Sequence, residues 1–402
     1  MAIPPIAALE IGTSRTVVCV GESDNGGRVK ITGVGIYSPT IGVRKGQVVD
    51  LSQASAGVDV AVKQAEKQAN VELWQVLLAI SGSHIQAAPH SGMVHIRSGG
   101  DSVVTPESIE EVSRNAEDSV HLEPEREILH TVQQSYTVDD QPGIFKPEGM
   151  RCRTLTKNVM AIHGQKSRIE NAVSVAKSVT LEVEDVAYSG VCAALAALTP
   201  EQKHEGVVLI DLGGGTTNYV AYNNDVISAA GCIAVGGDHV TNDIALAFNI
   251  SLKQAEDIKL KDGCAVIDAE SSVGRVTLTA DVGFEERALS RKALHTVINA
   301  RLDETFRVVR SKLDEAGVLS HMSRGIVLTG GGAYLEKVTD LARRVFGLPC
   351  SIGVPVNVDG LELAEQPAAL ATAAGLVLYG RMAYESRKAG SVISIFKRVF
   401  GK

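Results

Sequence analysis

The sequence predicts an α/β fold of two similar lobes, with a smaller α+β unit inserted into the first. Two strand-turn-strand segments with one pattern, Leu9–Ser14 and Ile210–Thr217, lie far apart in the chain and indicate a duplicated half. Each has an apolar strand, an acid, glycine and then hydroxyl residues. A third glycine-rich turn, Gly330–Gly332, follows another apolar strand. The insertion is indicated by residues 84–162, where prolines and histidines interrupt short β-type runs.

The first half has the pattern of three strands, a helix and a fourth strand. Val58, Val62, Ala65 and Ala69 recur at helical spacing, which predicts an amphipathic helix. The expected elements are the strands Ile6–Ile11, Thr16–Val20 and Val29–Ile36, the helix Leu51–Asn70 and the strand Val76–Ile80.

The segment 84–162 is expected to form short strands around one helix. Thr105 is a suitable N-cap, because Pro106 follows at the first helical position and Glu107 lies in the first turn. The histidines of this segment lack metal-ligand spacing, so we expect no metal site there. The expected elements are Gly92–Ile96, Gln133–Val138 and Thr154–Ile162 as strands and Pro106–Val120 as the helix.

The rest of the chain predicts the second half and a C-terminal helix. Asn223-Asn224 is expected at the tip of a hairpin, since asparagine tolerates positive φ. Gly317 is expected to end a long helix. The predicted helices are Lys166–Ser178, Tyr188–Leu198, Asp238–Phe248, Arg291–Ala316 and Gln366–Tyr384, the strands are Val207–Asp211, Asn218–Tyr222 and Asp225–Ser228, and the polar stretch is Glu385–Gly390.

Composition excludes several classes of protein. The net charge of −8 argues against broad nucleic-acid binding, which needs a basic surface. The six cysteines are scattered without a C-x-x-C pair, which favours free thiols over disulfides or zinc. No signal-peptide pattern and no apolar run long enough to cross a bilayer is present, so we expect a soluble, cytoplasmic body.

The glycine-rich turns together predict a nucleotide site. Glycine permits positive φ and lets backbone N–H groups approach phosphate oxygens, and hydroxyl groups add further donors. Glu10 and Asp211 end the preceding strands and would hold Mg²⁺ through water. The chain has no G-x-x-x-x-G-K-[ST] and no G-x-G-x-x-G in a β-turn-α context, which excludes a P-loop and argues against a Rossmann site. The phosphate-binding candidates are Glu10, Gly12, Thr13, Ser14, Asp211, Gly213, Gly214, Gly215, Thr216 and Thr217.

The chain resembles the FtsA family, bacterial actin-like proteins of cell division within the actin and heat-shock-chaperone ATPase superfamily. The segments that carry the resemblance are Leu9–Thr13, Glu127–His130, Ile210–Thr217, Val235–Phe248, Gly325–Gly332 and the C-terminal tail. The resemblance implies a duplicated actin-like, ribonuclease-H-like fold and an ATP·Mg site. It assigns the adenosine side to Gly330, Gly331 and Gly332, a helix start to Gly236, Gly237 and Asp238, and ribose and base contacts to Glu256 and Lys259.

The resemblance also implies a division into subdomains. The expected ranges are residues 1–83, 163–190 and 366–385 for 1A, 84–162 for the inserted 1C, 191–236 and 311–365 for 2A, 237–310 for 2B, and 386–402 for a linker with a membrane-targeting helix. Subdomain 1C would contact further subunits in a filament and recruit later division proteins. Most of the superfamily has Asp where Glu10 stands, so ATP binding is expected, with at most slow hydrolysis.

The tail Ser391–Lys402 has the pattern of an amphipathic helix that lies on an anionic membrane. At about 100° per residue its apolar side chains fall within roughly 160° of arc, opposite a basic face. A helix packed on the protein's own core is the alternative. The proposed membrane residues are Val392, Ile393, Ile395, Phe396, Lys397, Arg398, Val399, Phe400 and Lys402.

The leading functional hypothesis is an ATP-binding, filament-forming adaptor at the division site. By resemblance it would bind the C-terminal peptide of FtsZ on residues 237–310 and hold the FtsZ ring on the cytoplasmic face of the membrane. A sugar or acid kinase of the superfamily is one alternative, although no acid stands out as a general base. A pilus-assembly actin homologue is the other, and the basic amphipathic tail argues against it.

Overall fold

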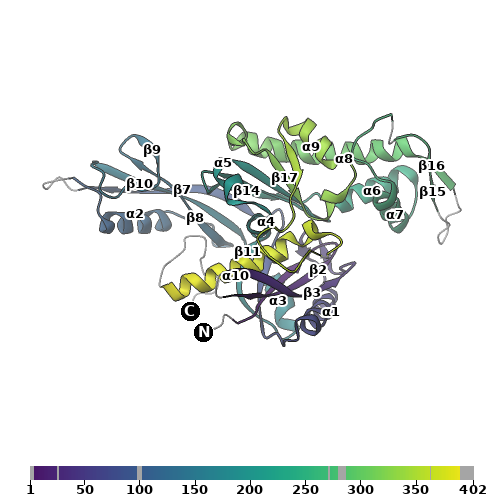
Figure 1. Cartoon of the computed structure of the whole chain (residues 1–402), viewed down its shortest axis with the longest axis horizontal. Helices are drawn as coiled ribbons and strands as arrows, with labels where there is room; N and C mark the ends of the chain where they lie inside the picture. The colour runs from purple at the N-terminus through teal and green to yellow at the C-terminus, as the bar shows by residue number, and fades with distance from the viewer. Residues whose placement is uncertain are drawn as a thin grey trace.

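The computed structural model describes residues 4–24, 27–96, 102–269, 272–278, 287–362 and 364–389. They form two lobes that each contain a five-stranded sheet, and a four-stranded sheet projects from one side (Figure 1). The duplicated α/β fold and the inserted α+β unit predicted from the sequence are confirmed.

The first sheet combines an antiparallel meander with two parallel strands. β1, β2 and β3 pair antiparallel, whereas β6 is parallel to β1 and β11 is parallel to β6. The order is β11-β6-β1-β2-β3, with β1 at the centre. The bounds are β1 (Ile6–Ile11), β2 (Thr16–Ser23), β3 (Val29–Tyr37), β6 (Gln75–Ile80) and β11 (Glu182–Tyr188); α1 (Leu51–Ala69), α3 (Lys166–Ser178) and the two-residue strands β4 (Val43–Arg44) and β5 (Gln47–Val48) complete this part.

The second sheet repeats this topology strand by strand. Its order is β14-β13-β12-β17-β18, with an antiparallel meander on one side of β12 and two parallel strands on the other. β12 therefore occupies the position that β1 has in the first sheet, and the duplication is a property of the topology. The bounds are β12 (Val207–Leu212), β13 (Thr217–Asn223), β14 (Val226–Ile233), β17 (Ile326–Thr329) and β18 (Cys350–Ile352).

Two helices connect the lobes. α4 (Ser189–Ala197) contacts β6 and β11 of the first sheet and β12 and β13 of the second. α10 (Ala371–Ala389) crosses α4 so closely that a Cβ on Gly375 would overlap the carbonyl of Cys192. Alanine and glycine at this crossing allow the close approach, which positions the two sheets on either side of a cleft.

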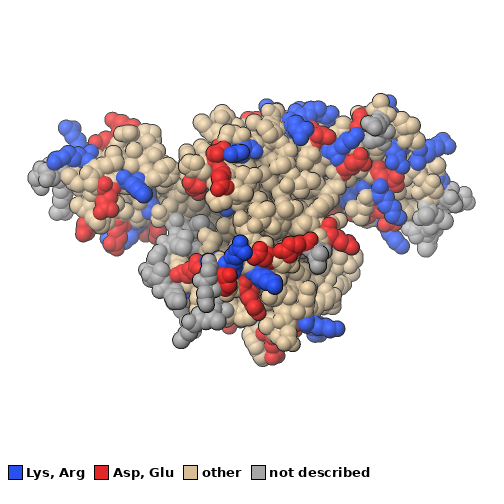
Figure 2. Space-filling view, viewed as in Figure 1, with Lys and Arg blue, Asp and Glu red and all other residues tan. Residues whose placement is uncertain are grey.

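The remaining helices cover the second sheet and extend away from it. Figure 2 shows acidic and basic side chains interspersed over the α6–α8 end, where ion pairs such as Arg291–Asp262 form. These elements are α5 (Pro200–Glu205), α6 (Gly237–Phe248), α7 (Leu252–Asp262), β15 (Arg275–Leu278), β16 (Arg287–Ser290), α8 (Arg291–Glu315), α9 (Val338–Phe346) and the 3₁₀ turns η1 (Leu319–His321), η2 (Gly331–Tyr334) and η3 (Pro367–Leu370).

The inserted unit has its own sheet and its own small core. The strand order is β7-β10-β8-β9, and α2 packs on β7 and β10. Thr105 caps α2 as predicted, because its side chain accepts a hydrogen bond from Ser108 N. Val94, Val112, Tyr136 and Leu155 belong to the core beneath the helix. The bounds are β7 (Gln86–His95), α2 (Pro106–Asp118), β8 (Arg126–Val138), β9 (Gln141–Ile144) and β10 (Thr154–Gln165).

Several predicted elements need correction. β7 and β8 begin earlier than predicted, because pairing with the long β10 extends both strands toward the first lobe. β11 was not predicted, and Tyr188 ends this strand instead of starting a helix. The hairpin tip is Asn224-Asp225, the two residues with positive φ, and not Asn223-Asn224. The polar stretch after Tyr384 continues α10 to Ala389.

Two buried histidines mark the junction of the inserted sheet with the first lobe. Arg126 Nε donates to His163 Nδ1 at 2.7 Å, and the backbone N–H of Gln165 donates to His84 Nδ1 at 3.1 Å. Both rings therefore accept a hydrogen bond and are held neutral. Burial, reinforced by the charge of Arg126, lowers the pKa of each imidazole from 6.5 to about 4.

We expect the free energy of unfolding to decrease as the pH falls from about 6.5 to about 4. In this window the unfolded chain binds protons at His84 and His163 that the folded chain does not bind. Stability therefore rises with pH and levels off above the imidazole pKa of the unfolded chain, 6.5. Urea unfolding at pH 7 and pH 5 measures the effect. His163→Gln should reduce the difference between the two pH values, whereas the exposed control His321→Gln should not. An equal pH dependence in His163→Gln would contradict this assignment.

Candidate functional site

A cavity of ≈ 550 Å³ lies between the lobes and is lined by residues from both. This volume suits a small-molecule ligand, for which pockets of about 300–1,000 Å³ are usual. Every residue that the sequence assigned to the phosphates, to adenosine, to the α6 start and to the base contacts lines this cavity. The tail residues assigned to the membrane lie outside the described part of the chain.

Two hairpin turns with the same geometry face each other across the cavity. Gly12 N donates to Arg15 O at 3.0 Å in the first, and Gly213 N donates to Thr216 O at 3.0 Å in the second. The tips are in contact: a Cβ on Gly214 would lie 2.8 Å from the Cβ of Ser14, and one on Gly215 would overlap the side chain of Thr13. Glycine is therefore needed here for the close approach of the two lobes.

Glu10 and Asp211 occupy equivalent positions in the two sheets. Glu10 pairs with Val17 of β2, and Asp211 pairs with Asn218 of β13. Burial raises the pKa of Glu10 to about 7, with Arg15 opposing the rise and Asp211 adding to it. Burial also raises the pKa of Asp211, against a 3.1 Å hydrogen bond from Asn218 Nδ2 and the charge of Arg15.

The Glu10 carboxylate lacks a partner that its burial demands. Although part of the side chain faces the cavity, Oε2 is buried and has no hydrogen-bond partner among the described residues. An orphaned buried oxygen is costly unless something bound in the cavity satisfies it. With Asp211 close enough to raise its pKa, the two carboxylates form an oxygen-donor pair that fits a hydrated divalent cation.

The third glycine turn packs on Asp211. Gly330 has φ of 84°, and the position of a Cβ there is occupied by the carboxylate of Asp211. Gly331, in contrast, has nothing within 4 Å of the position of a Cβ. The chain continues from this turn as the 3₁₀ turn η2, and α9 begins only at Val338. Gly330–Gly332 therefore present backbone without side chains to the cavity.

The start of α6 is tied to the second hairpin. Gly237 N donates to Gly213 O at 2.9 Å and Asp238 N donates to Gly214 O at 2.8 Å. These two N–H groups are engaged by the protein and position the hairpin. Gly236 has no room for a side chain, because a Cβ would meet the carbonyls of Gly213 and Gly214.

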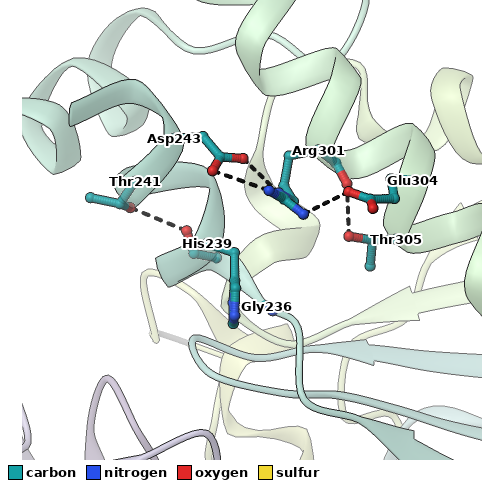
Figure 3. A network of polar contacts seen from close by, with 8 residues as sticks. Gly236, His239, Thr241, Asp243, Arg301, Glu304 and Thr305 are labelled. Carbon is teal, nitrogen blue, oxygen red and sulfur yellow. Dashed lines mark hydrogen bonds and ion pairs between the residues drawn. The ribbon is translucent and has the colours of Figure 1, made fainter. Parts of the chain in front are cut away.

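Lys259 and Glu256 of α7 line the cavity beside the start of α6. Lys259 Nζ pairs with Glu256 Oε2 at 2.6 Å and donates to Thr241 Oγ1 at 2.8 Å, and its side chain is only 11% exposed. Figure 3 shows how the adjoining helices are held together: Arg301 of α8 binds Asp243 of α6 through two nitrogens, at 2.6 and 3.1 Å. This bidentate pair fixes α6 against α8 beside the cavity.

Several residues of the cavity wall were not predicted from the sequence. They come from segments without a glycine-rich motif, namely the loop after β3, the turn between β4 and β5, the end of β6, the start of α4 and the segment before α10. The signal that was available is the dipeptide Lys45-Gly46 between short apolar runs, which is typical of a turn. Gly46 and Ser81 are two of these lining residues.

The comparisons with known proteins decide the family. The family model for "Cell division protein FtsA" matches residues 208–375, and the model for the "SHS2 domain inserted in FTSA" matches residues 82–163. The cell division protein FtsA of Pseudomonas aeruginosa is 34% identical over 93% of this chain and 89% of its own. The FtsA of Escherichia coli K12 is also 34% identical, over 98% of this chain and 96% of its own.

The chain belongs to the FtsA family of cell division proteins. The resemblance predicted from the sequence is thereby confirmed. FtsA relatives also occur in Neisseria meningitidis, at 31% identity over 92% of this chain and 89% of the relative.

Solved structures of low sequence identity share the fold. The PilM-PilN type IV pilus biogenesis complex matches with a TM-score of 0.64 at 18% identity, covering 94% of this chain and 98% of the other. MreB5 of Spiroplasma citri bound to AMPPNP matches with a TM-score of 0.56 at 16% identity, covering 96% and 98%. These likenesses establish an actin-like fold.

Two features are absent from the part of the chain that the structure describes. None of the helices there is long and apolar enough to cross a membrane. In the same residues, His, Cys, Asp and Glu side chains do not gather in groups of three or more that could hold a metal.

Proposed function

We propose that this FtsA-family chain binds ATP·Mg²⁺ between its lobes. The observation that carries the proposal is the pair of glycine hairpins with matching backbone hydrogen bonds, each after an acid, which line one cavity. Their backbone N–H and hydroxyl groups would bind phosphate oxygens. The structure of MreB5 bound to AMPPNP supports this proposal by its shared fold.

The carboxylates of Glu10 and Asp211 would hold Mg²⁺ through water. The orphaned Oε2 of Glu10 supports this role, because a water bound to the cation would satisfy it. The cation would neutralise phosphate charge. The longer Glu10 in place of aspartate and the absence of an evident base favour a nucleotide that is retained and at most slowly hydrolysed.

We further propose that the chain is a filament-forming adaptor that holds the FtsZ ring on the cytoplasmic face of the membrane at the division site. Subdomain 1C, residues 84–162, would recruit later division proteins, and 2B, residues 237–310, would bind the C-terminal peptide of FtsZ. The subdomains 1A and 2A would be the two sheet-bearing lobes, with the ranges given above. Family membership supports an adaptor over a kinase or a pilus protein.

The tail proposal rests on its sequence. Ser391–Lys402 would place Ile395, Phe396, Val399 and Phe400 into the headgroup region, with Lys397 and Arg398 at anionic lipids. One short helix binds weakly, whereas a filament carries many copies and gains avidity. Assembly and membrane attachment would therefore strengthen each other.

Co-sedimentation of FtsZ with anionic liposomes tests the adaptor. The full chain is expected to carry FtsZ into the lipid pellet, and a chain that ends at Gly390, which keeps α10 complete, is not. Phe396→Glu with Phe400→Glu should act like the truncation while keeping the length. Exposed Phe145→Glu in the insert is the matched control and should retain recruitment. Unchanged recruitment by the truncated chain would overturn the adaptor proposal.

A further inference from the structure

A two-residue turn from the first lobe reaches the tips of both phosphate hairpins. It consists of Lys45 and Gly46, which connect β4 to β5 and have φ of 52° and 71°. Two consecutive positive φ values are typical of a type I′ hairpin turn, where Asn and Gly are the usual residues. Lysine is an unusual choice at such a position, because its Cβ is disfavoured there. The unusual residue suggests a role for the side chain.

The contacts of Gly46 place this turn at the hairpins. Its N–H donates to Thr13 Oγ1 at 2.9 Å, which ties the turn to the first hairpin. The position of its missing Cβ lies 3.0 Å from Thr216 Cγ2 of the second hairpin and 3.4 Å from the backbone of Gly82. Gly46 therefore lies where the two lobes meet, and it lines the cavity.

The neighbouring end of β6 connects the same region to Asp211. Ser81 Oγ lies 3.1 Å from Thr216 Oγ1 and donates to Asn218 Oδ1 at 2.8 Å. Asn218 in turn donates to Asp211. The turn is thus next to a continuous polar chain that runs from the first lobe to the carboxylate proposed to hold Mg²⁺.

Lys45 directly precedes Gly46 and carries an available positive charge; Gly46 lines the cavity, whereas Lys45 lies beside it. Its side chain is exposed, and its ammonium has no hydrogen-bond or ion-pair partner within the part of the chain that the structure describes. Its charge reaches across to the second lobe, where it helps burial to lower the pKa of His239 in the first turn of α6. Two of the cations that line the cavity are engaged: Lys259 pairs with Glu256, and Arg15 donates to the carbonyl of Ala369.

We propose that Lys45 binds the terminal phosphate of a bound nucleoside triphosphate, with Gly46 holding the turn against both hairpins. The inference rests on the proposed function. The terminal phosphate is the charged group that distinguishes a triphosphate from a diphosphate. An ammonium that reaches the hairpin tips would contact this phosphate in ATP, and ADP has no such group to contact. Lys45 would therefore make the site selective for ATP over ADP.

Affinities of the full chain for ATP and ADP, both with Mg²⁺, test this role. Lys45→Asn removes the charge and keeps a residue that tolerates positive φ. We expect its ATP affinity to fall about threefold to tenfold, the range between an exposed and a well-formed charge-assisted contact. Its ADP affinity should stay unchanged. Lys45→Arg should restore ATP affinity, and Lys166→Asn, which removes an exposed charge on α3, should have no effect.

The outcomes separate this inference from the proposed function. If the unmodified chain binds neither nucleotide, the proposed function fails and this inference with it. If the unmodified chain binds both and Lys45→Asn leaves the ratio of ATP to ADP affinity unchanged, only the role of Lys45 is overturned. An equal loss for both nucleotides would also overturn it, since that result indicates a structural effect of the turn.

Discussion

Gly331→Val is expected to lower ATP affinity by at least about fivefold without reducing the free energy of unfolding. A side chain there meets nothing within 4 Å and the backbone is outside the positive-φ region, so the free chain can accommodate it. The space that it would fill is the cavity itself. A ligand that needs this space would be displaced at a cost of about 1–3 kcal/mol or more, which corresponds to at least about fivefold to 150-fold in affinity.

A second variant, Gly214→Val, should abolish ATP binding, because a further effect adds to the loss of space. Its side chain would meet Ser14 and the Asp238 carboxylate, 3.2 Å from the Cβ position, and push the hairpins apart. Gly214→Val is therefore expected to lower stability as well, whereas Gly331→Val is not. Calorimetric titration with ATP and urea unfolding of the same samples separate the two effects.

Ala288→Val is the matched control for these substitutions. It adds the same branched side chain at an exposed position of β16, away from the cavity wall. It should change neither ATP affinity nor stability. Retained ATP affinity in Gly331→Val would contradict the assignment of this cavity to the nucleotide.

Asp211→Asn is expected to remove the dependence of ATP affinity on Mg²⁺. Asparagine has nearly the same shape but cannot supply the negative charge that holds a hydrated cation. Because burial raises the pKa of Asp211, the neutral side chain should be tolerated in the folded chain, with stability unchanged or slightly increased. ATP titrations with Mg²⁺ and with EDTA measure the difference, which we expect to be large for the unmodified chain and small for the variant.

Asp185→Asn provides a control of matched chemistry. Asp185 is also buried, with its pKa raised to about 6, but it accepts a hydrogen bond from Tyr379 at 3.1 Å and does not line the cavity. Its substitution should leave the Mg²⁺ dependence intact. If Asp211→Asn binds ATP with the same Mg²⁺ dependence as the unmodified chain, Asp211 is not a cation ligand.

Patterns between near neighbours in the chain were predictable from the sequence. The cap at Thr105, the stop at Gly317 and the hydrophobic stripe of α1 depend on residues three or four positions apart, and the structure agrees with each. Elements whose form depends on distant partners were predicted less well. β7 and β8 are long because they pair with β10 over most of their length. β11 forms by parallel pairing with β6.

The same distinction holds for the features of the candidate site. The glycine and hydroxyl residues of the hairpins could be named from the sequence, because the conformation of each turn requires them locally. The orphaned oxygen of Glu10 and the neutral state of His84 and His163 could not, since burial and neighbouring charges cause them. The tip Lys45-Gly46 was missed because its partners Thr13 and Thr216 come from two different lobes.

By itself, the sequence determined the duplicated turns, the acids that precede them and the amphipathic pattern of the tail, because each of these depends only on a few consecutive residues. Only the tertiary structure decided that these turns face one cavity, how closely their tips approach and which charged groups remain without a partner. Such properties depend on side chains brought together from distant parts of the chain by the crossing of α4 and α10 and the packing of two sheets.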